Sequence, residues 1–192
     1  LMERMVFLHQ PTLADYLRNY YDKRNAATES YAYGTQKAKN TNLKQFAETI
    51  RFLEEQDVRT PEQLTEKIQE LDTQLKEVSQ RLNQQLSALR NINSNLYAIK
   101  ECFETRPVFL ELKNKYFGRE KFKEEHKKEL SGYYRSERIL KENLDPSGKI
   151  PEGQWKREAA RLSEEIAALR KEDKRIHAML RKYEGIKNHV EA

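Results

Sequence analysis

The residues of this chain that are best suited to hold a metal ion are four histidines and one cysteine. His9, His126, His177 and His189 never stand two to five residues from one another, and Cys102 is the single cysteine. A zinc site draws its ligands from closely spaced histidines and cysteines. The spacing therefore predicts no metal site and no cofactor.

His126 and Cys102 each have a structural interpretation. His126 lies four residues from both Phe122 and Leu130, which favours a partly buried packing histidine that donates one hydrogen bond over a phosphate contact or a proton carrier. Cys102 lies near the end of a long apolar stripe, so we interpret it as a small packing residue rather than a nucleophile.

Tyrosines gather near the start of the chain, at Tyr16, Tyr20, Tyr21, Tyr31 and Tyr33. A tyrosine can act as a nucleophile in strand transfer on DNA, but such a nuclease also needs a bound divalent metal. Aromatic packing between the first two helices is the preferred interpretation, with an unfamiliar tyrosine site near Tyr31 as the alternative. The chain has neither a Gly-rich phosphate loop nor a Gly-x-Ser-x-Gly motif, so we predict that it is not an enzyme.

Two basic stretches are suited to neutralise phosphate groups without reading a base sequence. The first surrounds Tyr116, Phe117 and Phe122, and the second lies in the last predicted helix. Acidic residues such as Glu120 and Glu172 are interleaved with both, which leaves an ordinary solvated helix surface as the alternative. The candidate contacts to DNA phosphates are Lys121, Lys123, Lys127, Lys128, Lys171, Lys174, Arg175 and Lys182.

A heptad pattern from Thr60 to about Glu104 predicts one long coiled-coil helix. Thr60-Pro61-Glu62-Gln63 predicts its start as a capping box, and Pro107 predicts its end because proline disfavours helical geometry in the preceding residue. The eleven-residue step from Leu82 to Asn93 predicts a four-residue stutter. The predicted seam consists of Leu64, Ile68, Leu71, Leu75, Val78, Leu82, Leu86, Leu89, Asn93, Leu96, Ile99 or Lys100, and Phe103.

The remaining segments predict shorter helices and a second long one. After a lead-in over 1–11, Thr12 and Asp15 cap a short helix, and a helix over 35–56 buries Leu43, Phe46, Ile50 and Leu53. A short helix over 107–116 ends at Gly118, a further helix covers 119–144, and residues 145–148 form a turn. A helix over 152–189 carries a second heptad stripe, interrupted by Asp173, and has the length to run antiparallel to the first.

These patterns predict an all-α fold, namely a long antiparallel coiled-coil hairpin with shorter packed helices. We expect two domains, an N-terminal helical segment over 1–59 and a coiled-coil or helical-bundle domain over 60–192. Because the second stripe supplies a partner from the same chain, a monomer is favoured. Composition agrees with long amphipathic helices, since 37% of residues are apolar and 35% are charged, with six glycines and five prolines.

Charge and the absence of apolar runs bear on partners and location. The net charge of +5 permits binding to nucleic acid or to an acidic partner. No run of 18 apolar residues and no signal peptide is present, and a single cysteine suits a reducing compartment, so we predict a soluble, cytoplasmic protein without membrane insertion. The chain begins with Leu1, which fits either a removed tag or a piece of a longer protein.

Short phrases from about residue 10 onward carry a family resemblance through their order and spacing. They are Leu13-Ala14-Asp15-Tyr16-Leu17, Tyr21-Asp22-Lys23-Arg24, Asn42-Leu43-Lys44-Gln45-Phe46-Ala47, Arg51-Phe52-Leu53, Thr60-Pro61-Glu62-Gln63-Leu64, Arg106-Pro107-Val108, Arg119-Glu120-Lys121-Phe122, Glu125-His126, Glu129-Leu130, Arg138-Ile139-Leu140-Lys141 and Trp155-Lys156-Arg157-Glu158. In this order the chain resembles the C-terminal helical region of MobA/MobL-type relaxases, the mobilization nucleases of plasmids and integrative elements.

The resemblance implies a non-catalytic accessory region. In that family an N-terminal domain nicks DNA with a tyrosine and a histidine-bound metal, and this chain has no counterpart of the histidine cluster, so no catalytic residue carries over. The implied role is to assist a DNA relaxase in plasmid or conjugative-element mobilization by binding DNA or other mobilization or secretion proteins. The alternative is a structural coiled-coil interaction or oligomerisation module with no nucleic-acid role, whose register Asn93 and Asp173 would set.

Overall fold

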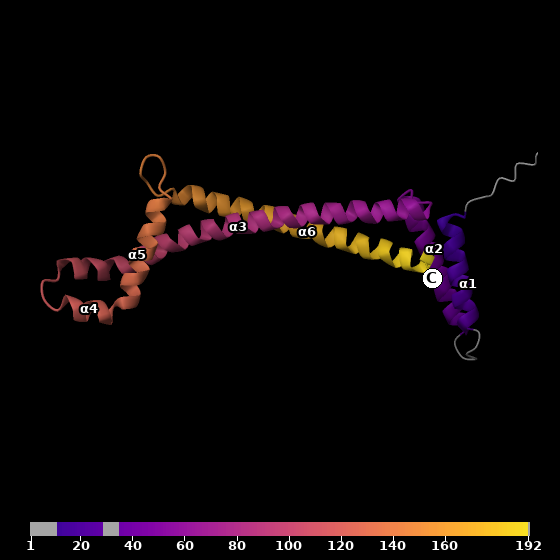
Figure 1. The fold of residues 1–192 in the computed structure, drawn as a ribbon, viewed down its shortest axis with the longest axis horizontal. Coiled ribbons are helices and arrows are strands. Elements are labelled where there is room, and N and C mark those ends of the chain that lie inside the picture. Colours follow the sequence, from indigo (N-terminus) through magenta and orange to yellow (C-terminus); the bar gives the residue numbers. More distant parts are fainter. Residues whose placement is uncertain (1–10, 29–34, 192) are drawn as a thin grey trace, which may run out of the picture. The chain divides into compact units, whose positions relative to one another are not determined.

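The computed structural model describes residues 11–28 and 35–191, and within these ranges all regular structure is helical. Figure 1 shows the helices α1 (Leu13–Thr28), α2 (Thr35–Glu55), α3 (Pro61–Asn114), α4 (Arg119–Glu125), α5 (Lys127–Glu142) and α6 (Glu152–Glu191). The predicted all-α class is confirmed. The predicted lead-in up to residue 10, His9 and the tyrosines Tyr31 and Tyr33 lie outside the described residues.

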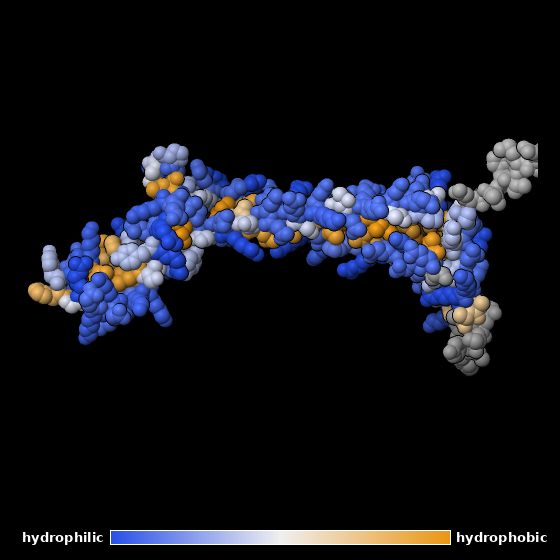
Figure 2. Space-filling model, in the orientation of Figure 1, coloured by the Kyte–Doolittle hydropathy of each residue, from blue (hydrophilic) through white to orange (hydrophobic). Residues whose placement is uncertain are grey.

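The chain divides into two compact units. The terminal unit joins the described residues up to Glu77 with those from Glu172 onward, and the middle unit comprises Val78–Lys171. The helices α3 and α6 each contribute to both units. The predicted domain division between residues 59 and 60 stays a prediction. Hydrophilic side chains cover most of the surface that is visible in Figure 2, as expected for helices that each bury one narrow face.

The terminal unit has a core to which four helices contribute. Its buried side chains are Leu13, Leu17 and Tyr21 from α1, Phe52 and Leu53 from α2, Leu64 and Leu71 from α3, Ile176, Leu180, Tyr183 and Ile186 from α6, and Val58 from the connection before α3. The ring of Tyr183 is fully buried and lies 5.1 Å from the ring of Phe52. Burial of these apolar groups, each contributing about 1.5–3 kcal/mol when fully buried, holds the unit together.

Two capping boxes start helices of this unit, as the sequence predicts. The Thr12 backbone N–H donates to Asp15 Oδ2 at 2.9 Å, and the Asp15 N–H donates to Thr12 Oγ1 at 3.4 Å. The Thr60 N–H donates to Gln63 Oε1 at 3.2 Å, and the Gln63 N–H donates to Thr60 Oγ1 at 3.3 Å. Each box satisfies N–H groups that have no partner in the first helical turn.

The inner face of α2 differs from the prediction by one residue. Leu43, predicted to be buried, is 66% exposed, whereas Asn42 is buried and its amide donates to Asn25 Oδ1 of α1 at 2.7 Å. Neighbouring residues on a helix point about 100° apart, so a face centred on Asn42, Phe46 and Leu53 leaves Leu43 in water. The polar pair of Asn42 with Asn25 replaces the expected apolar contact.

In the middle unit, α3 continues through Pro107 and ends at Asn114, so the predicted end at Pro107 is wrong. Proline removes the N–H donor to the carbonyl four residues earlier, here that of Phe103. Both Pro107 and Phe103 are exposed, and Phe103, predicted in the seam, is 80% exposed. Water on this side can bind the carbonyl that lacks a donor, while the packing of Leu112 beyond Pro107 keeps the last turns helical.

The predicted stutter in α3 depends on placing Asn93 in the apolar stripe, and the structure does not bury Asn93. Asn93 is exposed, and Ile92 beside it is half-buried. From Leu89 the half-buried positions continue through Ile92 to Leu96, in steps of three and four residues. The heptad spacing therefore continues through this region with Ile92 in place of Asn93.

The predicted helix over 119–144 is two helices, because the chain breaks at His126. The backbone angles of His126 are φ −112° and ψ 27°, and α4 and α5 run in different directions on either side of it (Figure 1). The break lets Phe122 of α4 and Leu130 of α5 enter one buried cluster with Leu112 of α3. Helix α5 ends at Glu142, and Leu144, predicted on the inner side, is exposed.

Two predicted loop features of the middle unit are confirmed. Gly118, between α3 and α4, has φ +70°, a left-handed conformation that glycine adopts without strain. In the turn before α6, Asp145 Oδ1 accepts hydrogen bonds from the Ser147 N–H at 2.9 Å and from the Lys149 N–H at 2.8 Å, and Gly148 has φ +76°. The hydrogen bonds from Ser147 and Lys149 lower the pKa of the Asp145 carboxyl.

Candidate phosphate-contacting residues and a pocket beside His189

All eight cations predicted to contact DNA phosphates have exposed side chains. They fall on three helices. Lys121 and Lys123 lie on α4, Lys127 and Lys128 begin α5, and Lys171, Lys174, Arg175 and Lys182 lie on α6.

The two lysines of α4 are engaged in local ion pairs. Lys123 Nζ lies 2.7 Å from Glu120 Oε1, and Lys121 Nζ lies 3.8 Å from Glu125 Oε1. The hydrogen bond from Lys123 lowers the pKa of Glu120. Exposed pairs of this kind are worth about 0–1 kcal/mol, so a phosphate can compete for these lysines.

Other predicted cations have no carboxylate partner within the part of the chain that the structure describes. This holds for Lys127 and Lys128 on α5 and for Lys171, Lys174 and Arg175 on α6, none of which lies within 4.0 Å of an acidic oxygen. Lys182 differs, because its Nζ lies 3.4 Å from the centre of the Phe52 ring. This cation–π contact turns Lys182 toward α2.

The aromatic residues of the first basic stretch separate into buried and exposed ones. Phe122 is buried, whereas Tyr116 and Phe117 are 91% and 90% exposed in the connection between α3 and α4. Lys115 is held locally, since its Nζ lies 3.6 Å from Glu111 and 4.6 Å from the Phe122 ring centre. We refer to the exposed pair Tyr116 and Phe117 as the aromatic tip.

A second group of polar side chains, which the sequence did not indicate as a site, lines a pocket of about 410 Å³ in the terminal unit. From its residue type, His189 was a candidate only for metal binding. Its spacing from neighbouring residues in the sequence does not link it to residues of α1 and α2. The lining residues are Tyr21 and Arg24 of α1, Gln45, Glu48 and Thr49 of α2, and Lys182 and His189 of α6.

His189 is held in this pocket by aromatic rings of α1. Its imidazole stacks on Tyr20 with ring centres 4.3 Å apart and meets Tyr21 edge-on at 6.0 Å. Its Nδ1 atom is buried and has no hydrogen-bond partner among the described residues. Burial, and to a lesser extent the charge of Arg24, lower the pKa of His189, so the ring is neutral near pH 7.

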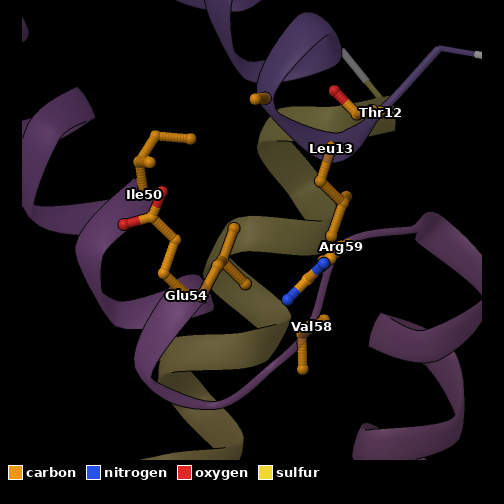
Figure 3. Close-up of a pocket in the computed structure, with 8 residues that line it drawn as sticks. Thr12, Leu13, Ile50, Glu54, Val58 and Arg59 are labelled. Carbon is orange, nitrogen blue, oxygen red and sulfur yellow. The ribbon is translucent and has the colours of Figure 1, made fainter.

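A larger, apolar pocket of about 440 Å³ lies in the same unit between α1, α2 and the connection to α3. Figure 3 shows Leu13, Ile50 and Val58 among its lining residues, together with Glu54 and Arg59. The Arg59 guanidinium lies 2.9 Å from Asp57 Oδ1. The lining therefore offers a surface for apolar contact and no group of titratable side chains that points to catalysis.

Three other residues that the sequence singled out, His126, Cys102 and Tyr21, lie in packing environments. His126 is half-buried and packs on Phe122 with ring centres 4.3 Å apart, as predicted for a packing histidine. Among the described residues its Nδ1 has no hydrogen-bond partner, and Glu129 Oε1 lies 3.7 Å from it. Burial raises the pKa of the half-buried Cys102, which disfavours the reactive thiolate. Tyr21 packs edge-on against Phe46 of α2 at 5.7 Å, as predicted for aromatic packing between the first two helices.

In the described residues, no three His, Cys, Asp or Glu side chains gather in a way that would hold a metal ion. Among the helices of the same residues, none combines the length and apolar character needed to cross a bilayer.

Comparison with protein-family models, curated proteins and solved structures found no match to this chain.

Proposed function

We propose that this chain is a non-catalytic accessory region that assists DNA binding by a relaxase in plasmid or conjugative-element mobilization. The observation that carries the proposal is the segment from Tyr116 to Lys128. It combines two aromatic side chains at least 90% exposed with the exposed cations Lys127 and Lys128, which have no carboxylate partner in the described chain. The family resemblance supplies the biological setting, and docking of other mobilization or secretion proteins is the second part of the proposed role.

The chemistry of this segment suits contact with single-stranded DNA. Lysine side chains neutralise phosphates, and aromatic rings offer faces on which bases stack, at about 1–3 kcal/mol per base. Neither interaction selects a particular base sequence. A duplex hides its base faces, so the aromatic tip would contribute to single strands and much less to duplex DNA.

The buried rows on the two long helices support an antiparallel coiled-coil hairpin as the scaffold. Leu64, Leu71 and Val78 on α3 are buried at seven-residue intervals. Leu162, Ile166, Leu169, Ile176, Leu180 and Tyr183 on α6 are buried in steps of three, four and seven residues, with half-buried Asp173 in the gap. Rows of this spacing are what two helices need in order to pack along one another within one chain.

We also propose a cytoplasmic location, which the single cysteine supports because a reducing compartment does not favour disulfides.

Fluorescence anisotropy with labelled single-stranded and duplex oligonucleotides tests the proposal at low and rising salt. We expect saturable binding that weakens steeply with salt, and single strands bound more tightly than duplex. Phe117→Ala should weaken single-strand binding about tenfold, as expected for the loss of one stacked base. The combined change Lys127→Gln and Lys128→Gln should weaken both DNA forms and reduce the salt slope by about two.

Matched controls are available in the middle unit. Tyr97 on α3 is another exposed aromatic residue, and Lys156 on α6 is an exposed lysine with Glu152 at 2.6 Å. Tyr97→Ala and Lys156→Gln should leave DNA binding unchanged. Absence of binding at low salt, where phosphate-driven affinity is strongest, would reject the DNA role.

The heptad rows equally favour the alternative of a structural interaction or oligomerisation module. Light scattering over a wide concentration range separates the two, because our proposal expects a monomer. A stable dimer combined with no DNA binding would establish the alternative.

A further inference from the structure

The pocket beside His189 brings three nitrogen-bearing side chains together from two helices distant in sequence. Arg24 comes from α1, and Lys182 and His189 come from α6, while Gln45, Glu48 and Thr49 of α2 complete the lining. Its volume of about 410 Å³ falls in the range of small-molecule sites, about 300–1,000 Å³. All these residues belong to the terminal unit.

The positive groups of the pocket are incompletely neutralised. Arg24 makes no ion pair with a carboxylate of the described chain, and Lys182 contacts the Phe52 ring rather than an acid among these residues. Glu48 is the acidic lining residue, and its side chain is 66% exposed with Lys44 Nζ at 3.9 Å. With two cations, Arg24 and Lys182, and one acid, Glu48, the lining is net positive.

Hydrogen-bonding capacity is also left over in the pocket. The Nδ1 atom of His189 is buried and has no hydrogen-bond partner in the part of the chain that the structure describes, although buried polar atoms are usually hydrogen-bonded. The Thr49 hydroxyl is already used, because it donates to the Gln45 carbonyl at 2.8 Å. This leaves Arg24, Lys182, the Gln45 amide and the imidazole as groups that can donate to a ligand.

We propose that this pocket binds a phosphate group, held by Arg24 and Lys182 with His189 as a third donor. A guanidinium binds two phosphate oxygens in parallel, and an ammonium adds a point charge. The stacked ring of Tyr20 fixes the plane of His189, so that Nδ1 keeps its position. The site is separate from the DNA-binding proposal in its residues, except that it includes Lys182, one of the predicted cations.

The geometry favours a phosphate over a metal ion or an apolar ligand. A metal ion would need carboxylate, thiolate or several imidazole ligands, and the pocket offers one acid and three nitrogen groups that are cationic or can become so. An apolar ligand would leave the buried Nδ1 of His189 without a partner and would remove water from the charged groups of Arg24 and Lys182. The source of the phosphate, a free ion or the terminal group of an oligonucleotide, is decided by experiment.

The test follows the side-chain signals of His189 by NMR during titration of the full chain with inorganic phosphate, at constant ionic strength set with chloride. We expect a saturable shift of the His189 signals and none for His177, which lies outside the pocket on the same helix. Phosphate should also raise the pH at which His189 protonates, since an anion favours the imidazolium. The charged groups that face it are Arg24, Glu48 and Lys182.

Variants establish which residues hold the ion. Arg24→Gln should weaken phosphate binding about tenfold or more, because it removes the guanidinium that would hold two phosphate oxygens. Arg18→Gln, which removes an exposed charge from the same helix outside the pocket, should change it less than twofold. Circular dichroism of both variants checks that they fold. Equal losses for Arg24→Gln and Arg18→Gln, or shifts that grow linearly with phosphate without saturating, would overturn the proposal.

A second titration identifies the source of the phosphate. A 5′-phosphorylated dinucleotide and the same dinucleotide without the phosphate are compared in the Lys127→Gln, Lys128→Gln double variant, which weakens the proposed DNA surface. Tighter saturation by the phosphorylated dinucleotide than by inorganic phosphate assigns the pocket to a nucleic-acid end. Equal affinity assigns it to the free ion. Saturation by the unphosphorylated form with the same affinity would reject a phosphate site.

Discussion

Glu101 of α3 and Ser136 of α5 form a hydrogen bond between two helices, with the Ser136 hydroxyl donating to Glu101 Oε2 at 2.5 Å. Ser136 is fully buried, and the Glu101 side chain is largely buried. Arg135 completes the contact, since its Nη2 lies 2.7 Å from Glu101 Oε1. The carboxylate thus joins α3 to α5 within the middle unit.

Replacement of this carboxylate is expected to destabilise the middle unit. Glu101→Ala leaves the buried Ser136 hydroxyl without its partner, which costs about 1–3 kcal/mol. Urea denaturation followed by circular dichroism measures the loss. The double variant Glu101→Ala with Ser136→Ala should recover part of it, because no polar group is then left unpaired. A double variant less stable than Glu101→Ala alone would contradict this account.

The same contact predicts a pH dependence. The hydrogen bond from Ser136, followed by the interactions with Arg135, lowers the pKa of Glu101 below its ordinary value of 4.5. A carboxyl with a lowered pKa in the folded state stabilises the protein above its unfolded pKa, and this contribution is lost as the pH falls through the folded pKa. The stability difference between the parent chain and Glu101→Gln should therefore shrink below about pH 4.5. A difference that does not depend on pH would contradict the assignment.

Two glycines in helices should respond oppositely to alanine. A Cβ on Gly132 of α5 would lie 3.0 Å from Glu101 Oε1, and Glu101 is held by Arg135 and Ser136 and cannot move freely. Gly185 of α6 has nothing within 4 Å of its added Cβ. Gly185→Ala should stabilise by about 0.5–1 kcal/mol through helix propensity, whereas Gly132→Ala should be neutral or destabilising. Stabilisation of equal size at both sites would show that the Glu101 side chain moves away from the added methyl group at little cost in free energy.

Pro107 offers a test of how α3 continues to Asn114. Because proline within a helix lacks a hydrogen-bond donor and crowds the preceding turn, Pro107→Ala should stabilise the middle unit by about 1 kcal/mol or more. Amide hydrogen exchange of residues 103–114 should slow in the variant. Faster exchange or a lower midpoint in urea would indicate that Pro107 ends the helix in solution.

His189 predicts a loss of stability in mild acid. Its pKa is lowered below 6.5, first by burial and then by Arg24, so the unfolded chain takes up a proton at a higher pH than the folded chain. Stability attributable to the neutral ring is present above the unfolded pKa and is lost as the pH falls through the folded pKa. The urea midpoint of the parent chain should fall more between about pH 7 and 5 than that of His189→Gln. Equal pH profiles would exclude His189 as the source.

Local features of the structure were predictable because they depend on a few neighbouring residues. The capping boxes at Thr12 and Thr60 and the turn at Asp145 each need only side chains within four positions. Gly118 is similar, because a left-handed backbone is strained for most other residues. The last helix was also predictable from the sequence, since its apolar residues recur at coiled-coil spacing.

Errors arose where packing outweighed local preference. Pro107 does not end α3, because Leu112 beyond it packs in a cluster that keeps the last turns in place. The break at His126 follows from contacts of Phe122 and Leu130, which lie on either side of it. Leu43 is more apolar than Asn42, yet the partner Asn25 on α1 decides which of the two is buried.

The sequence by itself determined that this protein is helical and where most helices begin, because periodicity and capping act over short distances. Only the tertiary structure decided that Arg24, Lys182 and His189 share one pocket and that Glu101 meets Ser136. Each group joins helices that are distant in sequence, α1 with α6 in the pocket, and α3 with α5 across the 35 positions between Glu101 and Ser136. Their proximity results from the packing of whole helices, which short-range spacing does not encode.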